Sequence, residues 1–311
     1  MVMAADKGKS SRIGRASSII PFGLFGTLIY LLPQVAAGKV YRFHLDWIPS
    51  LGITLSGAID GLSLLFALII CGVGFFVSLY AADYLPAKAE NGKFYIYLHG
   101  FLLAMLGLVV ADNILVMFVF WELTTLISYL LIGFECQLET ARQSARQALL
   151  VTGAGGLALL VGFLLLGNIA NTYDLSQISL QSGIIKADPL YLAVLVMVLG
   201  GSFTKSAQFP FHFWLPNAMT APTPISAFLH SATMVKAGIY LLARLHPILG
   251  GTHAWMGTLV LVGGITALLG SVLALQAIDL KRILAYTTIM ALGILTMFLG
   301  GQTTPALTAA M

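Results

Sequence analysis

Long apolar stretches separated by short polar segments make up most of this chain. Nine charge-poor stretches can be traced, at 17–37, 58–82, 94–111, 113–134, 147–169, 189–209, 225–243, 255–278 and 283–301. Most are longer than the ~20 residues that a helix needs to cross a hydrocarbon core. Leu, Ala, Gly, Met and Phe dominate them without the alternation of a barrel strand. The pattern predicts an all-α polytopic membrane protein with about nine transmembrane helices.

The composition agrees with a protein whose main solvent is lipid. Of the 311 residues, 59% are hydrophobic and 9% carry a charge, whereas soluble domains have about 25% charged residues. This excludes a soluble enzyme. The net charge of +4 is spread over the short connecting segments, so nucleic acid is not expected as a partner. Cys71 and Cys136 suggest neither a disulfide framework nor a metal cluster, and no cofactor is expected.

The apolar stretches organise the chain into one membrane domain. Residues 1–16 form a basic segment, 17–301 the transmembrane domain and 302–311 a short tail. The first stretch superficially resembles a signal peptide. It is longer than a typical signal core, contains Pro21 and Pro33, and is the first of many such stretches. We therefore interpret it as a membrane span.

The distribution of basic residues predicts the orientation of the spans. With a cytoplasmic N-terminus, ten basic residues fall on the inside: Lys7, Lys9, Arg12, Arg15, Lys88, Lys93, Arg142, Arg146, Lys281 and Arg282. Four fall on the outside: Lys39, Arg42, Lys186 and Arg244. Because cytoplasmic segments carry the excess of Lys and Arg, this count predicts a cytoplasmic N-terminus.

Ionisable residues inside the apolar stretches need an explanation. A charge at the bilayer centre costs at least ~2.5 kcal/mol on insertion scales. Glu122 follows Asn113 by nine residues, which places it about 13.5 Å into the membrane at about 1.5 Å per residue. Lys236 follows Ile225 by eleven residues, and the same rise gives a depth of about 16.5 Å.

Lys205 lies in a segment that favours an interrupted helix. Gly200, Gly201, Ser202 and Ser206 surround it, and Pro210 follows. Interrupted helices occur at membrane depth only beside a cavity or other protein. On a straight helix Lys205 would approach the cytoplasmic side, whereas an interruption would return it toward the middle, so its depth stays open.

Two interpretations of these charges compete. In one, Glu122, Lys205 and Lys236 form a structural cluster that pins helices together. In the other they pass protons, because a dry lysine loses its proton readily and a nearby carboxylate restores its affinity. The glycine-rich runs VTGAGGLALLVG and LVGGITALLG already allow close helix packing, which favours proton transfer.

Further polar residues have equally plain structural interpretations. His212 and His230 would extend a relay, since histidine titrates near neutral pH, or would simply pack. Lys281, with Arg282, would be a cytoplasmic anchor or part of the proton path. Asp60, Asp83 and His99 are expected to be interfacial or capping residues.

Three segments carry a family resemblance. They are TKSAQFPFHFWLPNAMTAPTPISAFLHSATMVKAGIYLLARLHP, FWELTTLISYLLIGF and LGSVLALQAIDLKRILAYTTIMALG. They closely resemble the large proton-translocating membrane subunits shared by respiratory complex I and Mrp-type multisubunit cation/proton antiporters. The segments TKSAQFPFHFWLP and LHSATMVKAG most resemble the A subunit of the Mrp-type Na+/H+ antiporter.

The resemblance implies roles for individual residues. Glu122 would be the carboxylate of an ion pair, Lys205 its partner on the broken helix, and Lys236 the next proton carrier. His230 and Lys281 would continue a lateral polar path, with His212 beside it. It also implies a bacterial cell membrane protein without a redox centre, with other antiporter subunits, Na+ and H+ as partners.

The chain departs from the family pattern in two ways. Family members typically begin with one more helix and contain a second inverted repeat. Here one repeat and the first two helices of the next are present, so we expect a fragment or a split subunit. The alternatives to an antiporter are a proton-pumping subunit of a quinone- or ferredoxin-linked oxidoreductase and a structural scaffold that has lost conduction.

Overall fold

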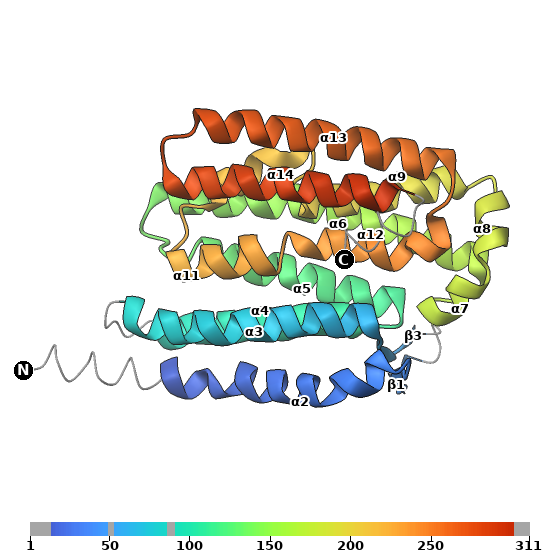
Figure 1. The fold of residues 1–311 in the computed structure, drawn as a ribbon, viewed down its shortest axis with the longest axis horizontal. Coiled ribbons are helices and arrows are strands. Elements are labelled where there is room, and N and C mark those ends of the chain that lie inside the picture. The colour runs from blue at the N-terminus through green and yellow to red at the C-terminus, as the bar shows by residue number, and fades with distance from the viewer. Residues whose placement is uncertain (1–13, 49–52, 86–90, 302–311) are drawn as a thin grey trace, which may run out of the picture.

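The computed structural model describes residues 14–48, 53–85 and 91–301, apart from the side chains of 231 and 232. Its helices run side by side in alternating directions and form an elongated bundle (Figure 1). Seven helical segments are long and apolar enough to span a membrane, and α9 is a shorter apolar helix. An all-α polytopic membrane fold is thereby confirmed.

The long helices match the predicted stretches within a few residues, except that one extends further toward its N-terminus. They are α2 (Ile19–Ala36), α3 (Gly61–Tyr84), α4 (Asn91–Val110), α5 (Ile114–Ile132), α6 (Glu139–Ala170), α13 (His253–Gln276) and α14 (Leu280–Gly300). The long α6 begins at Glu139, eight residues before the predicted stretch. Polar residues in its first two turns extend the helix beyond the apolar part.

Short elements cover one end of the bundle, where α2 ends and α3 begins (Figure 1). Strand β1 (Tyr41–Phe43) pairs antiparallel with β4 (Gly57–Ile59), and β2 (Asp46–Ile48) pairs with β3 (Ile53–Thr54). Helices α7 (Leu175–Leu180) and α8 (Ser182–Ala187) lie at the same end. We call this the strand end, and the opposite end, where α2 begins, the N-terminal end.

Two of the membrane helices are interrupted. Helix α9 (Tyr191–Lys205) ends at the predicted break and is followed by η2 (Phe211–Phe213) and α10 (Trp214–Ala218). The stretch predicted at 225–243 is also divided: α11 (Thr223–Ser226) continues into the π-helix η3 (Ala227–Ala232), and α12 (Lys236–Leu249) starts anew. The sequence predicted only the first interruption.

Glycines bring the helices into close contact, as the sequence predicted. A Cβ atom at Gly263 of α13 would lie 2.6 Å from the carbonyl oxygen of Gly293 in α14. A Cβ atom at Gly293 would in turn lie 2.7 Å from the carbonyl oxygen of Gly263. Backbone contact of this kind replaces side-chain interlocking and holds helices together where lipid offers no hydrophobic driving force.

Charged residues gather at the two ends of the bundle. Arg15 and Asp83 form an exposed ion pair, 3.1 Å between Nη2 and Oδ1, at the N-terminal end. Of the ten basic residues predicted on the inside, Lys7, Lys9, Arg12 and Lys88 lie outside the described residues. Segments 1–13 and 302–311, which hold most of the predicted basic segment and the tail, lie outside them as well.

Candidate functional site

Lys205 is the most deeply buried charged residue of the described chain. It is the last residue of α9 and is 0% exposed. Its Nζ donates to the carbonyl oxygen of Trp121 at 3.1 Å and to Oγ1 of Thr125 at 2.7 Å. The ammonium group also lies 5.0 Å from the centre of the Trp121 ring. The end of α9 thus places Lys205 beside the middle of α5. Of the two depths left open by the sequence, the structure supports the one in the middle of the bundle.

Glu122 lies on α5 between the two residues that bind Lys205. Its Oε1 is buried without a hydrogen-bond partner among the described residues. A Cβ atom at Gly156 of α6 would lie 1.7 Å from this oxygen, so the carboxylate fills space left by the glycine. The described ion pairs do not include Glu122 with Lys205. Glu122 thus lies next to Trp121, a direct partner of Lys205, and the ion pair that the resemblance implies stays a prediction.

Lys236 opens the second interrupted helix. It is the first residue of α12, and its side chain is partly exposed. The first turn of α12 packs on the end of α9, where Ser202 Oγ donates to the carbonyl oxygen of Gly238 at 3.0 Å. The contact of these helix ends brings Lys205 and Lys236 to the same region. As the first residue of α12, Lys236 lies at the positive end of the helix dipole, which disfavours a positive charge there.

His230 is buried in the π-helix η3. It is 1% exposed, and neither ring nitrogen has a hydrogen-bond partner among the described residues. Its ring packs edge to face against Trp214, with 6.0 Å between centres. The Trp214 indole Nε1 in turn donates to the carbonyl oxygen of Thr204 at 2.9 Å. Trp214 therefore connects His230 to the residue next to Lys205.

The other two candidates lie farther along the same interrupted region. Lys281 Nζ donates to the carbonyl oxygens of Ala221 at 3.0 Å and Met219 at 3.4 Å, between α10 and α11. His212 lies in η2, stacked on Phe209 with 6.2 Å between ring centres, and its buried Nδ1 has no partner in the described part of the chain. These contacts are typical of a residue that holds the connection between α10 and α11 in place.

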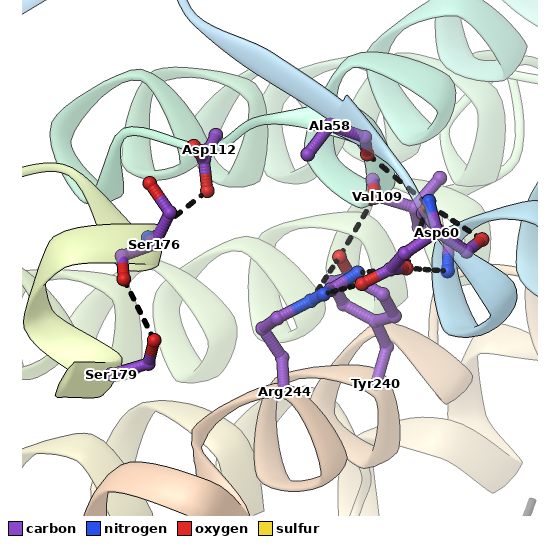
Figure 2. Close-up of polar contacts among 9 residues, drawn as sticks. Ala58, Asp60, Val109, Asp112, Ser176, Ser179, Tyr240 and Arg244 are labelled. Atoms are coloured by element: carbon purple, nitrogen blue, oxygen red, sulfur yellow. Dashed lines mark hydrogen bonds and ion pairs between the residues drawn. The ribbon is translucent and has the colours of Figure 1, made fainter. Parts of the chain in front are cut away.

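A second polar cluster, at the strand end, was not predicted. Asp60 caps α3 through a capping box with Ser63, as expected of a capping residue. It also binds both terminal nitrogens of Arg244, with 3.0 Å between Nη2 and Oδ1 (Figure 2). Arg244 Nε donates to the Tyr240 hydroxyl at 3.0 Å, and this hydroxyl donates to the Val109 carbonyl at 2.7 Å. The cluster ties α3, α4 and α12 together.

The charge of this cluster is stabilised by its own hydrogen bonds. Burial alone would raise the pKa of Asp60, but the hydrogen bonds and charge of Arg244, with the bonds from Ser63, lower it to about 2. Nearby, Asp112 accepts from the backbone amide of Ser176 at 3.2 Å (Figure 2). Burial raises the pKa of Asp112. The only sequence signal for the cluster was the spacing of Tyr240 and Arg244 on one face of a helix.

Known proteins share both the sequence and the fold of this chain. The chain is 47% identical to the A subunit of a Na(+)/H(+) antiporter from Alkalihalophilus pseudofirmus, over 91% of this chain and 35% of that protein. It is also 47% identical to the A/B subunit of a probable K(+)/H(+) antiporter from Rhizobium meliloti, over 86% and 27%. The Mrp complex structure from Dietzia sp. DQ12-45-1b matches with a TM-score of 0.89 and 40% identity, over 99% of this chain and 34% of that one.

The chain spans about a third of the length of these relatives. Residues 47–95 match the family described as NADH-ubiquinone oxidoreductase (complex I), chain 5 N-terminus. Residues 111–311 match the family described as NADH:quinone oxidoreductase/Mrp antiporter, TM. The second match covers more than half of the chain and includes Glu122, Lys205, His212, His230, Lys236 and Lys281. The chain therefore belongs to the NADH:quinone oxidoreductase/Mrp antiporter transmembrane family.

Proposed function

We propose that this chain is part of a subunit of a multisubunit antiporter that exchanges Na+ or another monovalent cation for protons. The observation that carries the proposal is the set of titratable groups in the bundle interior, at the ends of two interrupted helices. Lys205 and His230 are fully buried, and Glu122 and Lys236 lie beside the same breaks. The names of the relatives support the reaction class.

Each side chain of the relay has a separate role in proton transfer. Lys205 Nζ holds the proton while Trp121 and Thr125 accept two of its hydrogen bonds. The neighbouring Glu122 carboxylate stabilises the charged amine, and its movement away releases the proton. Lys236 is the next acceptor, and His230 and Lys281 extend the path laterally. The ring nitrogens of His230, which have no hydrogen-bond partner among the described residues, leave one site to receive a proton and one to donate it.

A redox-driven proton pump is the second candidate function, because the family description also covers NADH:quinone oxidoreductases. There, electron transfer in partner subunits would drive the same relay, and this chain would still hold no redox centre. The antiporter names of relatives with 47% identity favour the first candidate. Neighbouring genes discriminate: a set of six or seven small antiporter genes supports antiport, whereas hydrogenase or quinone-reductase genes support the pump.

The proposal includes an orientation and a location. The N-terminal end of the bundle, with Arg142 and Lys281, faces the cytoplasm of a bacterial cell, and the strand end faces outward. The other subunits of the antiporter are the partners, and the chain acts as a transporter component rather than a catalytic enzyme.

Proton flux in membrane vesicles tests the proposal. Vesicles from cells that express the full operon would be compared with vesicles in which this chain alone is deleted, and Na+ or K+ would be added to each. Proton movement that depends on the cation and disappears with the deletion supports the antiporter. Unchanged cation-dependent flux after deletion would reject it.

A further inference from the structure

Two cavities follow one another along a single face of α6. The first, of about 840 Å³, lies at the N-terminal end between α6, α10 and the start of α14, and its lining includes Arg146 and Arg282. The second, of about 500 Å³, is a groove between α6, α9 and η2. Leu150 and Val151 belong to both linings. The two cavities are therefore continuous, polar at the end of the bundle and apolar farther in.

The polar cavity offers unpaired positive charge. Neither Arg146 nor Arg282 takes part in an ion pair of the described residues, and both are exposed. The one carboxylate in the lining belongs to Asp279, whose Oδ1 accepts the backbone amide of Lys281 at 2.8 Å as the cap of α14. Gln147 contributes an amide whose oxygen accepts from Asn217 at 2.8 Å. This environment suits a phosphate and repels a proton or a metal cation.

The groove is lined almost entirely by apolar or small residues. Its lining includes the small residues Ala154, Gly155, Ala158 and Gly200, and Phe211 and Phe213 of η2. Leu150, at the junction of the two cavities, is 71% exposed. The groove therefore opens toward the lipid and not toward the relay, which lies behind Gly155 and Gly156.

Helix length places the two cavities at matching depths of a bilayer. Helix α6 has 32 residues, about 48 Å, against about 30 Å of hydrocarbon. Its apolar part starts after Arg146, so this arginine lies at the level of the lipid headgroups. From Arg146 to Ala158 the helix rises about 18 Å, slightly more than one hydrocarbon leaflet of about 15 Å.

We propose that this continuous cavity binds one anionic phospholipid, with its phosphate between Arg146 and Arg282 and an acyl chain in the groove. Basic pockets between transmembrane helices bind anionic headgroups on the cytoplasmic side, the side assigned above to this end. The lipid would cover the outer face of the contact between α6 and α9 that positions Lys205. One phospholipid molecule matches both the positive charge of the polar cavity and the combined length of the two cavities.

Native mass spectrometry of the complex, purified with its partner subunits and stripped of lipid, tests the headgroup site. The probes are phosphatidylglycerol, phosphatidylcholine and inorganic phosphate. We expect specific binding of phosphatidylglycerol, weaker binding of phosphatidylcholine, and no retention of inorganic phosphate. The double variant Arg146→Gln/Arg282→Gln should bind phosphatidylglycerol about 30-fold more weakly, the effect of two charges at about 1 kcal/mol each.

Matched variants separate the site from general charge and packing effects. Arg142→Gln removes the same charge one turn away on α6, where Arg142 binds Glu139 and lines a different cavity, and should leave binding unchanged. Gly200→Leu fills the groove, since a Cβ atom there meets only Ala158 at 3.8 Å. It should weaken phosphatidylglycerol binding, whereas Gly153→Leu, outside the groove and with no atom within 4 Å of its Cβ, should not.

A photocrosslinker identifies the occupant of the groove directly. With benzoylphenylalanine in place of Phe213, the proposal expects lipid adducts after illumination of native membranes. Adducts mainly with a partner subunit would assign the groove to a protein helix and overturn the proposal. Equal affinity for the two lipids, or equal effects of the double variant and Arg142→Gln, would overturn it as well.

Discussion

Lys205 donates a hydrogen bond of 3.1 Å to the carbonyl oxygen of Trp121, the residue that precedes Glu122, instead of bonding to the Glu122 carboxylate. The amine is therefore held by uncharged groups of α5. The carboxylate stays one residue away, with one oxygen unbonded in the described structure. Its position lets Glu122 move without breaking the bonds that fix Lys205.

This arrangement predicts that Glu122 and Lys205 are energetically coupled. Removing one partner leaves an uncompensated buried charge, which typically costs about 3–5 kcal/mol. The variants Glu122→Gln and Lys205→Met should each lower the thermal stability of the complex, and the double variant should be more stable than the sum of the two losses implies. Strictly additive losses would show that the charges are independent. Normal transport by both single variants would remove the pair from the mechanism.

Gly156 provides a test of Glu122 that leaves its charge intact. A methyl group at this position would meet Oε1 of Glu122 at 1.7 Å, so Gly156→Ala should displace the carboxylate. We expect cation-dependent proton flux to fall at least about tenfold, the effect of about 1.4 kcal/mol on a barrier, while the complex still assembles. Gly153→Ala on the same helix meets no atom within 4 Å and serves as the control. Equal flux in both variants would show that this position of Glu122 is not required.

The Asp60–Arg244 pair predicts a pH-dependent contribution to stability. The folded-state pKa of Asp60, about 2, lies below its ordinary value of 3.8, so the contribution is complete above about pH 4 and is lost as the pH falls toward 2. Asp60→Asn should cost at most about 2 kcal/mol at neutral pH, because solvent screens a carboxylate that is 29% exposed.

Thermal unfolding of the purified complex between pH 7 and pH 3 measures this contribution. The difference between the parent protein and Asp60→Asn should narrow toward the acid end. Asp83→Asn is the matched control, since its ion pair with Arg15 has side chains 68% and 64% exposed and should contribute little. An Asp60→Asn effect that does not change with pH would contradict the assigned ion pair.

The orientation can be tested with a thiol that the chain already carries. Cys136 is exposed and precedes α6, whereas Cys71 is buried. If the N-terminal end is cytoplasmic, an impermeant thiol reagent added to intact cells should leave Cys136 unmodified until the cells are permeabilised. Lys39→Cys, in a Cys136→Ser background, should react without permeabilisation. The opposite pattern would invert the topology.

The 311-residue chain alone should not catalyse antiport. It spans about a third of its relatives, and the relay occupies the middle of one repeat, whereas protons must cross about 30 Å of hydrocarbon. Purified chain in liposomes should show no Na+-dependent proton movement. Activity should appear when the partner subunits are co-expressed with the rest of the length that the relatives have and this chain does not cover. Exchange by the chain alone would mean that an oligomer or a shorter route completes the path.

Hydropathy was sufficient to predict the helices because the bilayer dictates both their length and their composition. The break after Lys205 was also predictable, since Gly200, Gly201 and Pro210 mark it. The second break was not. The segment FLHSATMVK contains neither glycine nor proline, and the contact of His230 in its π-helix is with Trp214, sixteen positions away.

The geometry of the site depended on contacts that are distant in sequence. Asp60 and Arg244 lie 184 positions apart, so sequence reasoning recognised only the local capping role of Asp60. Charge at membrane depth drew attention to Glu122 and Lys205. The sequence did not reveal that Trp121 and Thr125 would take the place of the carboxylate as direct partners of the amine.

The interruption after α9 is held in place by side chains. The Trp214 indole bonds to the carbonyl of Thr204, and the hydroxyl of Ser202 bonds to the carbonyl of Gly238. Such bonds make the broken backbone a rigid corner rather than a hinge. The fast conformational changes of a transport cycle at this corner are then rotamer changes of individual side chains, which take nanoseconds or less when the side chain is unrestrained. Stiffening the backbone at this corner would therefore leave these side-chain movements unaffected.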